Sequence, residues 1–411
     1  MPNDDIEVLI VGAGAAGIAA ARRLHDAGVD CLLVEARDRL GGRAFTAVTQ
    51  GYPLDLGCGW LHSADRNPWV AVAQTQGRAI DRTPPPWNRP GVGLGFPPEE
   101  QHAYRAAMEA FFERVSDLAG KDVDVAASDA LEPGNRWNGL ISAICTYIGG
   151  AEPERLSALD FDNYADTEIN WRVVDGYGAL IAAYAAGVPV RLNCEVRRID
   201  RGGARLRIET SQGTITAAKV VVALPASMIA EMENLFSPIL PDKVEAALGL
   251  PLGLADKLFL SLDAAEDFEP GGRLFGAIDR VATATYHMRP FGRPMIEVYF
   301  GGSNAAELER GGIAAFADFA TRELVSHFGA GIARRVRPLA MHLWAADPFA
   351  RGSYSYATPG HAGCRAALAA TVEERIYFAG EACSTHDFST AHGAYHTGVA
   401  AAEAILAARR R

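Results

Sequence analysis

The chain has 411 residues and a formal net charge of −11, from 39 Lys and Arg against 50 Asp and Glu. With 49% apolar and 22% charged residues, its composition is that of a globular protein and excludes disorder as the main state. At roughly 100 to 200 residues per domain, the length predicts two to four domains or one large nucleotide-binding enzyme with insertions. The acidic balance argues against nucleic acid as a partner.

Cysteine usage and the N-terminal residues predict the compartment. The six cysteines include no C-x-x-C pair and no Cys/His cluster at zinc spacing, so we expect reduced thiols and no metal site. The first residues are acidic where a signal peptide would be basic, and no apolar run reaches the roughly 18 residues of a membrane span. We therefore expect a cytoplasmic protein without a membrane partner, and the oligomeric state stays open.

The hydrophobic pattern predicts the elements in chain order. An apolar run at 8–11 ends in glycine, an alanine-rich helix follows over 15–25, and a second apolar run covers 31–34. The proline- and glycine-rich stretch 83–98 is typical of a surface connection near a domain boundary. Further on we expect helices over 101–118 and 137–148, a small meander of strands over 189–192, 196–199, 205–209 and 219–224, strands of another sheet at 257–262 and 295–300, a helix over 313–328, a buried strand at 376–380 and a long helix over 393–410.

A glycine fingerprint lies between the first expected strand and helix. It consists of Gly12, Gly14 and Gly17, with Ala15 and Ala16 opening the helix, where backbone N–H groups and the helix dipole can receive a pyrophosphate. Glu35 stands 18 residues beyond the last glycine, at the end of the second strand, where a carboxylate can bind ribose hydroxyls. This combination predicts a dinucleotide site, the alternative being a glycine-rich turn in an unrelated α/β domain.

The residues that follow favour FAD over NAD. Glu35-Ala36-Arg37 leads into Gly41-Gly42-Arg43, a glycine pair plus arginine that resembles the second signature of the glutathione-reductase-like FAD proteins. Gly42 permits a tight backbone approach, and Arg43 offers a fork of donors to phosphate or flavin oxygens. The alternative for Arg43 is a surface charge on a turn.

Three downstream stretches resemble the flavin-containing amine oxidase family, especially polyamine oxidases and flavin-dependent lysine demethylases. They are residues 377–398, 55–62 and 344–356. The resemblance implies that Glu381 binds the ribityl chain or a nearby donor, and that His62 faces the substrate. It implies cofactor contacts for Gly57, Cys58, Gly59, Trp60, Val196, Trp344, Tyr354, Gly380, Gly393 and Ala394.

The same resemblance implies the catalytic residues. Lys257 corresponds to the lysine that holds a water against the flavin N5. Tyr354 corresponds to one wall of the amine cage, and Thr390 stands where monoamine oxidases have the second tyrosine. Trp60 and His62 complete the expected set. Ser353 replaces the cysteine that attaches FAD covalently in monoamine oxidases, so the resemblance implies noncovalent FAD.

The expected fold is an α/β flavoprotein. It combines a glutathione-reductase-like FAD-binding Rossmann domain with a discontinuous α+β substrate-binding domain of the amine oxidase type. We expect the FAD-binding domain over 1–75, 176–252 and 341–411. We expect a mainly helical substrate segment over 76–175 and a second one, of sheet and helix, over 253–340.

The expected activity is FAD-dependent amine oxidation. A hydride passes from the alpha carbon of a small-molecule amine to flavin N5, the imine is hydrolysed to an aldehyde or ketone, and molecular oxygen reoxidises FAD with release of hydrogen peroxide. Asp65 or Glu168 is a candidate for binding a second ammonium group.

Alternatives remain at this level. An L-amino-acid oxidase needs a cavity arginine for the carboxylate, for which Arg172 and Arg289 are candidates. A flavin desaturase is a further enzyme alternative, and a lysine demethylase is less favoured because no histone-docking insertion is evident. A redox-silent FAD-binding partner protein is the alternative from another class.

Overall fold

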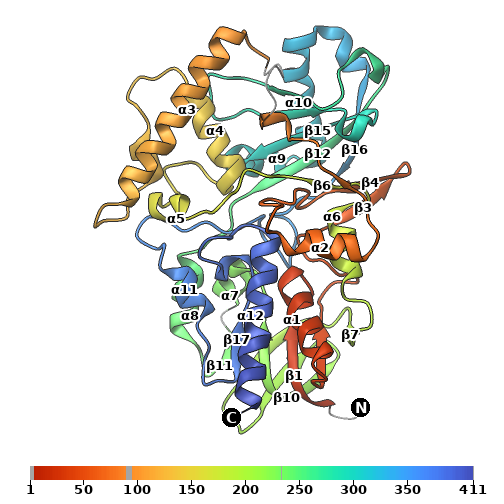
Figure 1. Cartoon of the computed structure of the whole chain (residues 1–411), viewed down its shortest axis with the longest axis vertical. Helices are drawn as coiled ribbons and strands as arrows, with labels where there is room; N and C mark the ends of the chain where they lie inside the picture. Colours follow the sequence, from red (N-terminus) through yellow and green to blue (C-terminus); the bar gives the residue numbers. More distant parts are fainter. Residues whose placement is uncertain (1–3, 89–94, 233, 411) are drawn as a thin grey trace.

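The computed structural model describes residues 4–88, 95–232 and 234–410. Its elements form two β-sheets with helices around them (Figure 1). In the view of Figure 1 the larger sheet lies in the lower part with both chain ends, and the smaller sheet lies in the upper part beside α3 and α4. Chain segments far apart in sequence meet in the larger sheet.

The larger sheet has eight strands in the order β11-β8-β9-β10-β1-β2-β7, and β17 also pairs with β10. Its parallel centre joins β1 to β2 and β10, while β8, β9 and β10 form an antiparallel meander. The central strands are buried on both faces, as is typical of parallel sheets. The strands are β1 (Asp4–Val11), β2 (Cys31–Val34), β7 (Val190–Arg191), β8 (Val196–Asp200), β9 (Leu206–Thr210), β10 (Gly213–Val222), β11 (Phe236–Ser237) and β17 (Ile376–Phe378).

Two helices from opposite ends of the sequence, α1 (Ala15–Asp26) and α12 (Ala391–Arg409), lie side by side (Figure 1). Their approach is close, because a Cβ on Gly398 would lie 2.1 Å from the carbonyl oxygen of Ala16. The chain therefore brings its C-terminal helix against the helix that begins at the glycine fingerprint. The other helices near the larger sheet are α2 (Pro68–Thr75), α6 (Tyr177–Ala183), α7 (Ala226–Glu231), α8 (Pro241–Leu248) and α11 (Cys364–Ala369).

The smaller sheet has five antiparallel strands in the order β13-β14-β15-β12-β16. They are β12 (Ala255–Leu262), β13 (Gly272–Phe275), β14 (Thr285–Met288), β15 (Met295–Gly301) and β16 (Val336–Met341). Because side chains alternate between faces, Leu258, Val298 and Phe300 lie on one face, in the apolar core with α10 (Gly312–Phe328). Lys257 and Tyr299 therefore lie on the opposite face.

The remaining helices, short strands and 3₁₀ turns lie around the two sheets. The helices α3 (Pro98–Ala119), α4 (Asn138–Gly149) and α5 (Ala158–Asp162) share a core that includes Phe111, Trp137 and Leu140. The remaining elements are β3 (Thr46–Thr49), β4 (Tyr52–Asp55), β5 (Ile80–Asp81), β6 (Arg172–Val173), α9 (Gly302–Glu309) and the 3₁₀ turns η1 (Pro86–Asn88), η2 (Ala127–Ala130), η3 (Ala265–Asp267), η4 (Pro290–Gly292), η5 (Ala330–Arg334) and η6 (Glu381–Cys383).

The expected helices and strands are present with shifted ends. The last helix begins at Ala391 rather than 393, and the strand expected over 219–224 is the end of the longer β10. The sequence pattern missed β3, β4, β13, β14 and β16, which are short or follow turns. Of the expected connection over 83–98, residues 89–94 lie outside the described residues, and α3 already begins at Pro98.

Candidate active site

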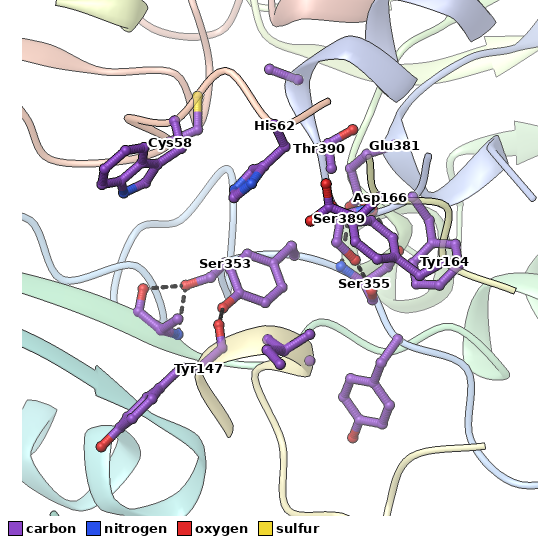
Figure 2. A pocket seen from close by; sticks show the side chains of 18 of the residues that line it. Cys58, His62, Tyr147, Tyr164, Asp166, Ser353, Ser355, Glu381, Ser389 and Thr390 are labelled. Atoms are coloured by element: carbon purple, nitrogen blue, oxygen red, sulfur yellow. Dashed lines mark hydrogen bonds between the residues drawn. The ribbon is translucent and has the colours of Figure 1, made fainter. Parts of the chain in front are cut away.

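A cavity of about 830 Å³ is bounded by residues of the smaller sheet, of the helices α1, α3, α4, α5 and α12, and of loops that include those following β10 and β17 of the larger sheet. Figure 2 shows part of its wall, with Cys58 and His62 coming from the 57–62 loop and Glu381, Ser355 and Ser389 close together. The site residues expected from the sequence that line this cavity are Gly14, Ala15, Ala16, Arg43, Gly57, Cys58, Gly59, Trp60, His62, Lys257, Trp344, Tyr354, Gly380, Glu381, Thr390 and Ala394.

A smaller cavity of about 90 Å³ adjoins the first, because Gly14, Arg43 and Leu224 line both. The expected cofactor residues in its wall are Gly12, Gly14, Glu35, Ala36, Arg37, Gly42, Arg43 and Val196. The Glu35 carboxylate is buried and accepts hydrogen bonds from the backbone N–H groups of Ala13 (2.8 Å) and Arg37 (2.9 Å). Its orientation at the end of β2 is therefore fixed by the backbone.

Two of the expected cofactor residues line neither cavity. A Cβ on Gly17 would lie 1.9 Å from the carbonyl oxygen of Gly12, and a Cβ on Gly393 would lie 1.9 Å from that of Asp387. Each glycine therefore allows a helix to pack closely against the preceding turn, and the cofactor contact expected for it stays a prediction.

The residues around the two cavities fit a dinucleotide. The helix α1 begins after Gly14 without a side-chain cap, so its first N–H groups are free of such a partner where the two cavities meet. Gly42 lies at a φ of +58° beside Gly14, and a Cβ there would lie 3.2 Å from the Gly14 Cα. Arg43 and Glu35 then supply a donor fork and a carboxylate on either side of this turn.

Arg43 is held in the cavity wall by Glu381. Its Nη1 donates to Glu381 Oε1 (2.8 Å) and to the carbonyl of Ser353 (2.8 Å). Glu381 also accepts from the Ser355 hydroxyl (2.6 Å) and from the backbone N–H of Ser389 (3.0 Å). Burial alone would raise the pKa of Glu381, but the charge of Arg43 and these hydrogen bonds lower it. Glu381 is thus an ionised anchor for the donors around it.

Lys257 lies buried on the cavity face of β12. Its Nζ donates to the carbonyl of Asp55 (3.1 Å) and lies 3.6 Å from Glu297 Oε1. The Asp55 carboxylate in turn accepts from the backbone N–H groups of Tyr177 and Gly178, which begin α6. The lysine is therefore fixed between the 55–62 segment and the smaller sheet.

Glu297 is a site residue that the sequence analysis missed. Arg172 Nη1 donates to its Oε2 at 2.8 Å, and the ring of His287 lies 3.7 Å away. Burial opposes ionisation, but the charges of Arg172 and Lys257 and the bond from His287 hold the pKa of Glu297 well below its usual range. The carboxylate is the common counter-ion of both cations.

Three tyrosines form another part of the wall. The Tyr354 hydroxyl donates to the carbonyl of Tyr147 (2.5 Å) and lies 3.2 Å from the Tyr299 hydroxyl. Burial raises the pKa of Tyr354 and brings that of Tyr299 to about 12, so both rings stay neutral. Of these three tyrosines, only Tyr354 was expected from the sequence. Tyr299 was detectable, because it alternates with apolar residues in the strand 295–301, as Glu297 does.

Thr390 lines the cavity, but its hydroxyl is committed to the start of α12. It accepts from the backbone N–H of Gly393 (3.0 Å) and donates to the carbonyl of Asp387 (2.6 Å). This is a helix N-cap, which explains a threonine at this position independently of any contact with an amine.

His62 and Trp60 complete the expected catalytic set. His62 Nδ1 lies 2.6 Å from the side-chain oxygen of Asn170, and burial lowers the pKa of the imidazole. The guanidinium of Arg172 lies 4.9 Å from the ring centre of Trp60, and Trp87 contacts the same indole edge-on. Trp60 therefore packs between the cavity and the guanidinium of Arg172, which is paired with Glu297.

Ser353 is engaged with the neighbouring strand β12. Its hydroxyl donates to the carbonyl of Ala255 (2.8 Å) and accepts from the N–H of the same residue (2.9 Å). Cys58 lines the cavity as a half-buried free thiol, and desolvation raises its pKa to about 12. A neutral thiol is a poor nucleophile, so neither side chain is suited to covalent attachment of a cofactor.

Four charged residues were expected as candidates for binding a charged group of the substrate, and they differ in whether they line the cavity. Neither Arg172 nor Arg289 lines the cavity; Arg289 donates to the carbonyls of Phe268 and Gly292 instead. Asp65 does not line it either and accepts from the Thr167 hydroxyl. Glu168 does line it, so of these four candidates only Glu168 is in place to meet a ligand.

Residues 4–88, 95–232 and 234–410 were searched for a metal site and for a membrane-spanning helix. This part of the chain contains no group of three or more His, Cys, Asp or Glu side chains placed to hold a metal ion. None of its helices combines the length and hydropathy of a transmembrane span.

The fold and the paired cavities define a dinucleotide-dependent enzyme, and comparison with known proteins specifies it. Residues 10–74 match the NAD(P)-binding Rossmann-like domain, and residues 100–406 match the family described as flavin containing amine oxidoreductase. The chain belongs to this flavin-containing amine oxidoreductase family. It is a flavin-dependent oxidoreductase of CH–NH or CH–NH₂ groups with noncovalent FAD as its cofactor.

Relatives of similar length include polyamine oxidases. The chain is 28% identical to Polyamine oxidase 2 of Arabidopsis thaliana, over 96% of this chain and 87% of that protein. It is 29% identical to Lysine-specific histone demethylase 1 homolog 1 of Oryza sativa subsp. japonica, over 98% of this chain but only 53% of that protein. A putrescine oxidase structure with bound putrescine shares the fold, with a TM-score of 0.81 at 18% identity over 99% of this chain and 100% of that one.

Proposed function

We propose that the protein oxidises a small amine at its alpha carbon and passes the electrons to molecular oxygen. In this reaction the amine loses a hydride and a proton, water hydrolyses the imine to an aldehyde or ketone, and oxygen takes two electrons and two protons to give hydrogen peroxide. Bound FAD supplies the hydride acceptor, its N5 atom. The observation that carries the proposal is buried Lys257, held by Asp55 and Glu297 in a cavity wall that continues to the dinucleotide turn.

The chain's own residues hold and orient the reactants. Lys257, with its ammonium group fixed between a carbonyl and a carboxylate, can order one water molecule in the cavity. The neutral rings of Tyr354 and Tyr299 provide aromatic faces for the amine, and their hydroxyls are already engaged. His62 is neutral at physiological pH because burial lowers its pKa, so it adds no competing positive charge.

The cavity mouth favours a cationic substrate. Asp162, Asp166 and Glu168 line the cavity and are exposed to solvent, which makes its entrance acidic in a chain of net charge −11. Such a charge distribution raises the local concentration of ammonium ions. Relatives named polyamine oxidase and putrescine oxidase agree with a di- or polyamine as the substrate class, with Glu168 in place for a second ammonium group.

Neither of the two arginines considered for an amino-acid oxidase is in place to bind a substrate carboxylate. Arg172 is paired with Glu297, and Arg289 lies outside the cavity. Among the contacts of the described residues, none favours a desaturase over an amine oxidase.

Two further assignments are proposed with the function. The segments 1–75, 176–252 and 341–411 bind FAD, and 76–175 and 253–340 bind the substrate. Six free cysteines support a cytoplasmic location.

An anaerobic titration tests the function. The holoenzyme is mixed without oxygen with alkylamines, diamines, polyamines and amino acids, and flavin bleaching is recorded, followed by peroxide release in air. We expect bleaching by amines. No bleaching by any amine, with photoreduction intact, would support the redox-silent alternative. Lys257→Met should lower kcat/KM by about 100-fold with FAD retained, since it misplaces the water and the facing segment, whereas exposed Lys121→Met should not.

A further inference from the structure

Arg273 is a cavity residue that the sequence analysis did not single out. It lies on β13, at the edge of the smaller sheet, and its side chain is partly exposed to the cavity. Its Nε donates to the Thr285 hydroxyl at 3.0 Å, and its guanidinium lies over the rings of Phe275 (4.7 Å) and Trp87 (5.6 Å). These contacts fix the plane of the guanidinium and use one of its five N–H donors.

Arg273 differs from the other Lys and Arg side chains in the wall in its ion pairing. Arg43 is paired with Glu381 and Lys257 with Glu297, whereas within the described residues no carboxylate pairs with Arg273. The ionisable groups that act on it are the hydroxyl groups of Tyr104 and Tyr147, which burial keeps neutral by raising their pKa values. Burial without a counter-ion lowers the pKa of Arg273. Such a cation gains more from an anionic ligand than a solvated one does.

The sheet register gives the distance from the reacting end. Across the strands, Phe275 pairs with Thr285, Thr285 with Tyr299, and Tyr299 with Lys257. Arg273 lies two residues before Phe275, on the same face. Three strand spacings of about 4.8 Å and an offset of two residues along the strand place the backbone of Arg273 roughly 16 Å from that of Lys257. A group bound by Arg273 is therefore far from a carbon that reacts beside Lys257.

We propose that Arg273 binds a carboxylate at the far end of the substrate, so that the preferred substrates are long amines with a terminal carboxylate. This inference rests on the proposed amine oxidation, and it selects a long aminocarboxylate in place of the di- or polyamine that the names of the relatives suggest. The cavity carries both signs of charge, with exposed carboxylates at Asp162, Asp166 and Glu168 and the unpaired guanidinium at Arg273. That arrangement complements a zwitterion better than a simple diamine.

Three substrates of one length test the proposal: dodecylamine, diaminododecane and ω-aminododecanoate. An extended chain advances about 1.2 Å per bond, so twelve carbons cover roughly the strand separation. In the wild-type holoenzyme kcat/KM should be highest for the aminocarboxylate. Arg273→Gln should lower that value alone by about 10- to 100-fold, the scale of a lost charge-assisted hydrogen bond. Arg273→Lys should keep part of it, because it keeps the charge.

The control is Arg280→Gln, which removes the same charge from an exposed residue paired with Asp279. It should leave all three values unchanged. Equal losses for the three substrates in Arg273→Gln, or no wild-type preference for the carboxylate, would overturn the proposal. If no amine is oxidised, the proposed function fails. Calorimetric binding of dodecanoate to the wild type and to Arg273→Gln then tests the role of Arg273 separately. Tenfold weaker binding to the variant supports carboxylate binding by Arg273, and equal binding refutes it.

Discussion

Glu297 joins three side chains that come from separate parts of the chain. Arg172 and Lys257 carry the positive charges that it balances, and His287 adds a third contact from β14. Both cations are buried with it, so a change in this one carboxylate leaves two charges without a counter-ion. Removing one member of such a buried network is costly, because the remaining charges cannot return to water.

Glu297→Gln should therefore lower the free energy of unfolding by about 3 to 5 kcal/mol at neutral pH. Urea denaturation of the holoenzyme measures it. The control is Glu195→Gln, which affects an exposed pair with Arg197 and should cost no more than about 1 kcal/mol. A loss for Glu297→Gln as small as that of the control would contradict the role of this carboxylate.

The stability of the wild type and that of Glu297→Gln should depend differently on pH. The folded-state pKa of Glu297 lies well below its ordinary value of 4.5, so its ionisation contributes stability that is complete above that pH. That contribution is lost as the pH falls from about 4.5 toward the folded-state pKa. The stability difference between wild type and Glu297→Gln should therefore shrink on acidification, and a constant difference would argue against the low pKa.

At the scale of elements, the contact between α1 and α12 connects the ends of the chain. Gly398 allows it, because any side chain there would collide with the backbone of Ala16. Gly398→Ala should push the helices apart and cost about 1 to 3 kcal/mol, with weaker FAD retention, since α1 begins at the dinucleotide turn. Gly331→Ala, whose Cβ would meet no atom within 4 Å, is the matched control. Thermal unfolding and the flavin content after gel filtration measure both effects.

How well each element could be predicted depended on whether its signal was local. The unit β1–α1–β2 was predictable from a short apolar run, a glycine turn and Glu35, all within about one βαβ unit. The hairpin strands β3, β4, β13 and β14 are four residues long, too short for a period to stand out from the turns around them.

The missed site residues show the same limit. Arg273 lies on β13, and nothing local indicates that this strand ends up three strands from Lys257. Glu297 and Tyr299 occupy alternate positions of a strand that was expected, but which of its faces meets Lys257 follows only from the register of β12 and β15. The family resemblance predicted the residues expected around the cofactor, but it did not predict the residues that line the far part of the cavity.

At the scale of the whole molecule, the cavity combines side chains of the smaller sheet with turns and loops that follow strands of the larger sheet. The larger sheet and α1 supply the dinucleotide turn, the smaller sheet supplies Lys257 and Arg273, and α4 supplies Tyr147. Because the wall is assembled from segments spread between Gly14 and Ala394, the site exists only when the full chain is folded. Exposed acidic residues at its mouth attract ammonium ions, whereas the hydride transfer needs a neutral amine, so the protonation state of the substrate affects the reaction.

The last prediction concerns that protonation state. Hydride leaves carbon readily only when the amine nitrogen has a free electron pair, while an alkylamine in water is an ammonium ion with a pKa of about 10. The shifts in the cavity point away from the neutral range: burial lowers the pKa of His62 below 6.5, the charges of Arg172 and Lys257 lower that of Glu297 in spite of its burial, and burial raises those of Tyr299 and Cys58 to about 12. The rate should therefore follow the substrate, with kcat/KM rising about tenfold per pH unit between roughly pH 6 and 9. An amine of lower pKa, such as an aromatic methylamine, should move the inflection to lower pH by the difference between the two amines. A flat profile over this range, or an inflection that stays in place when the amine is changed, would show that an enzyme group rather than the amine controls the reaction.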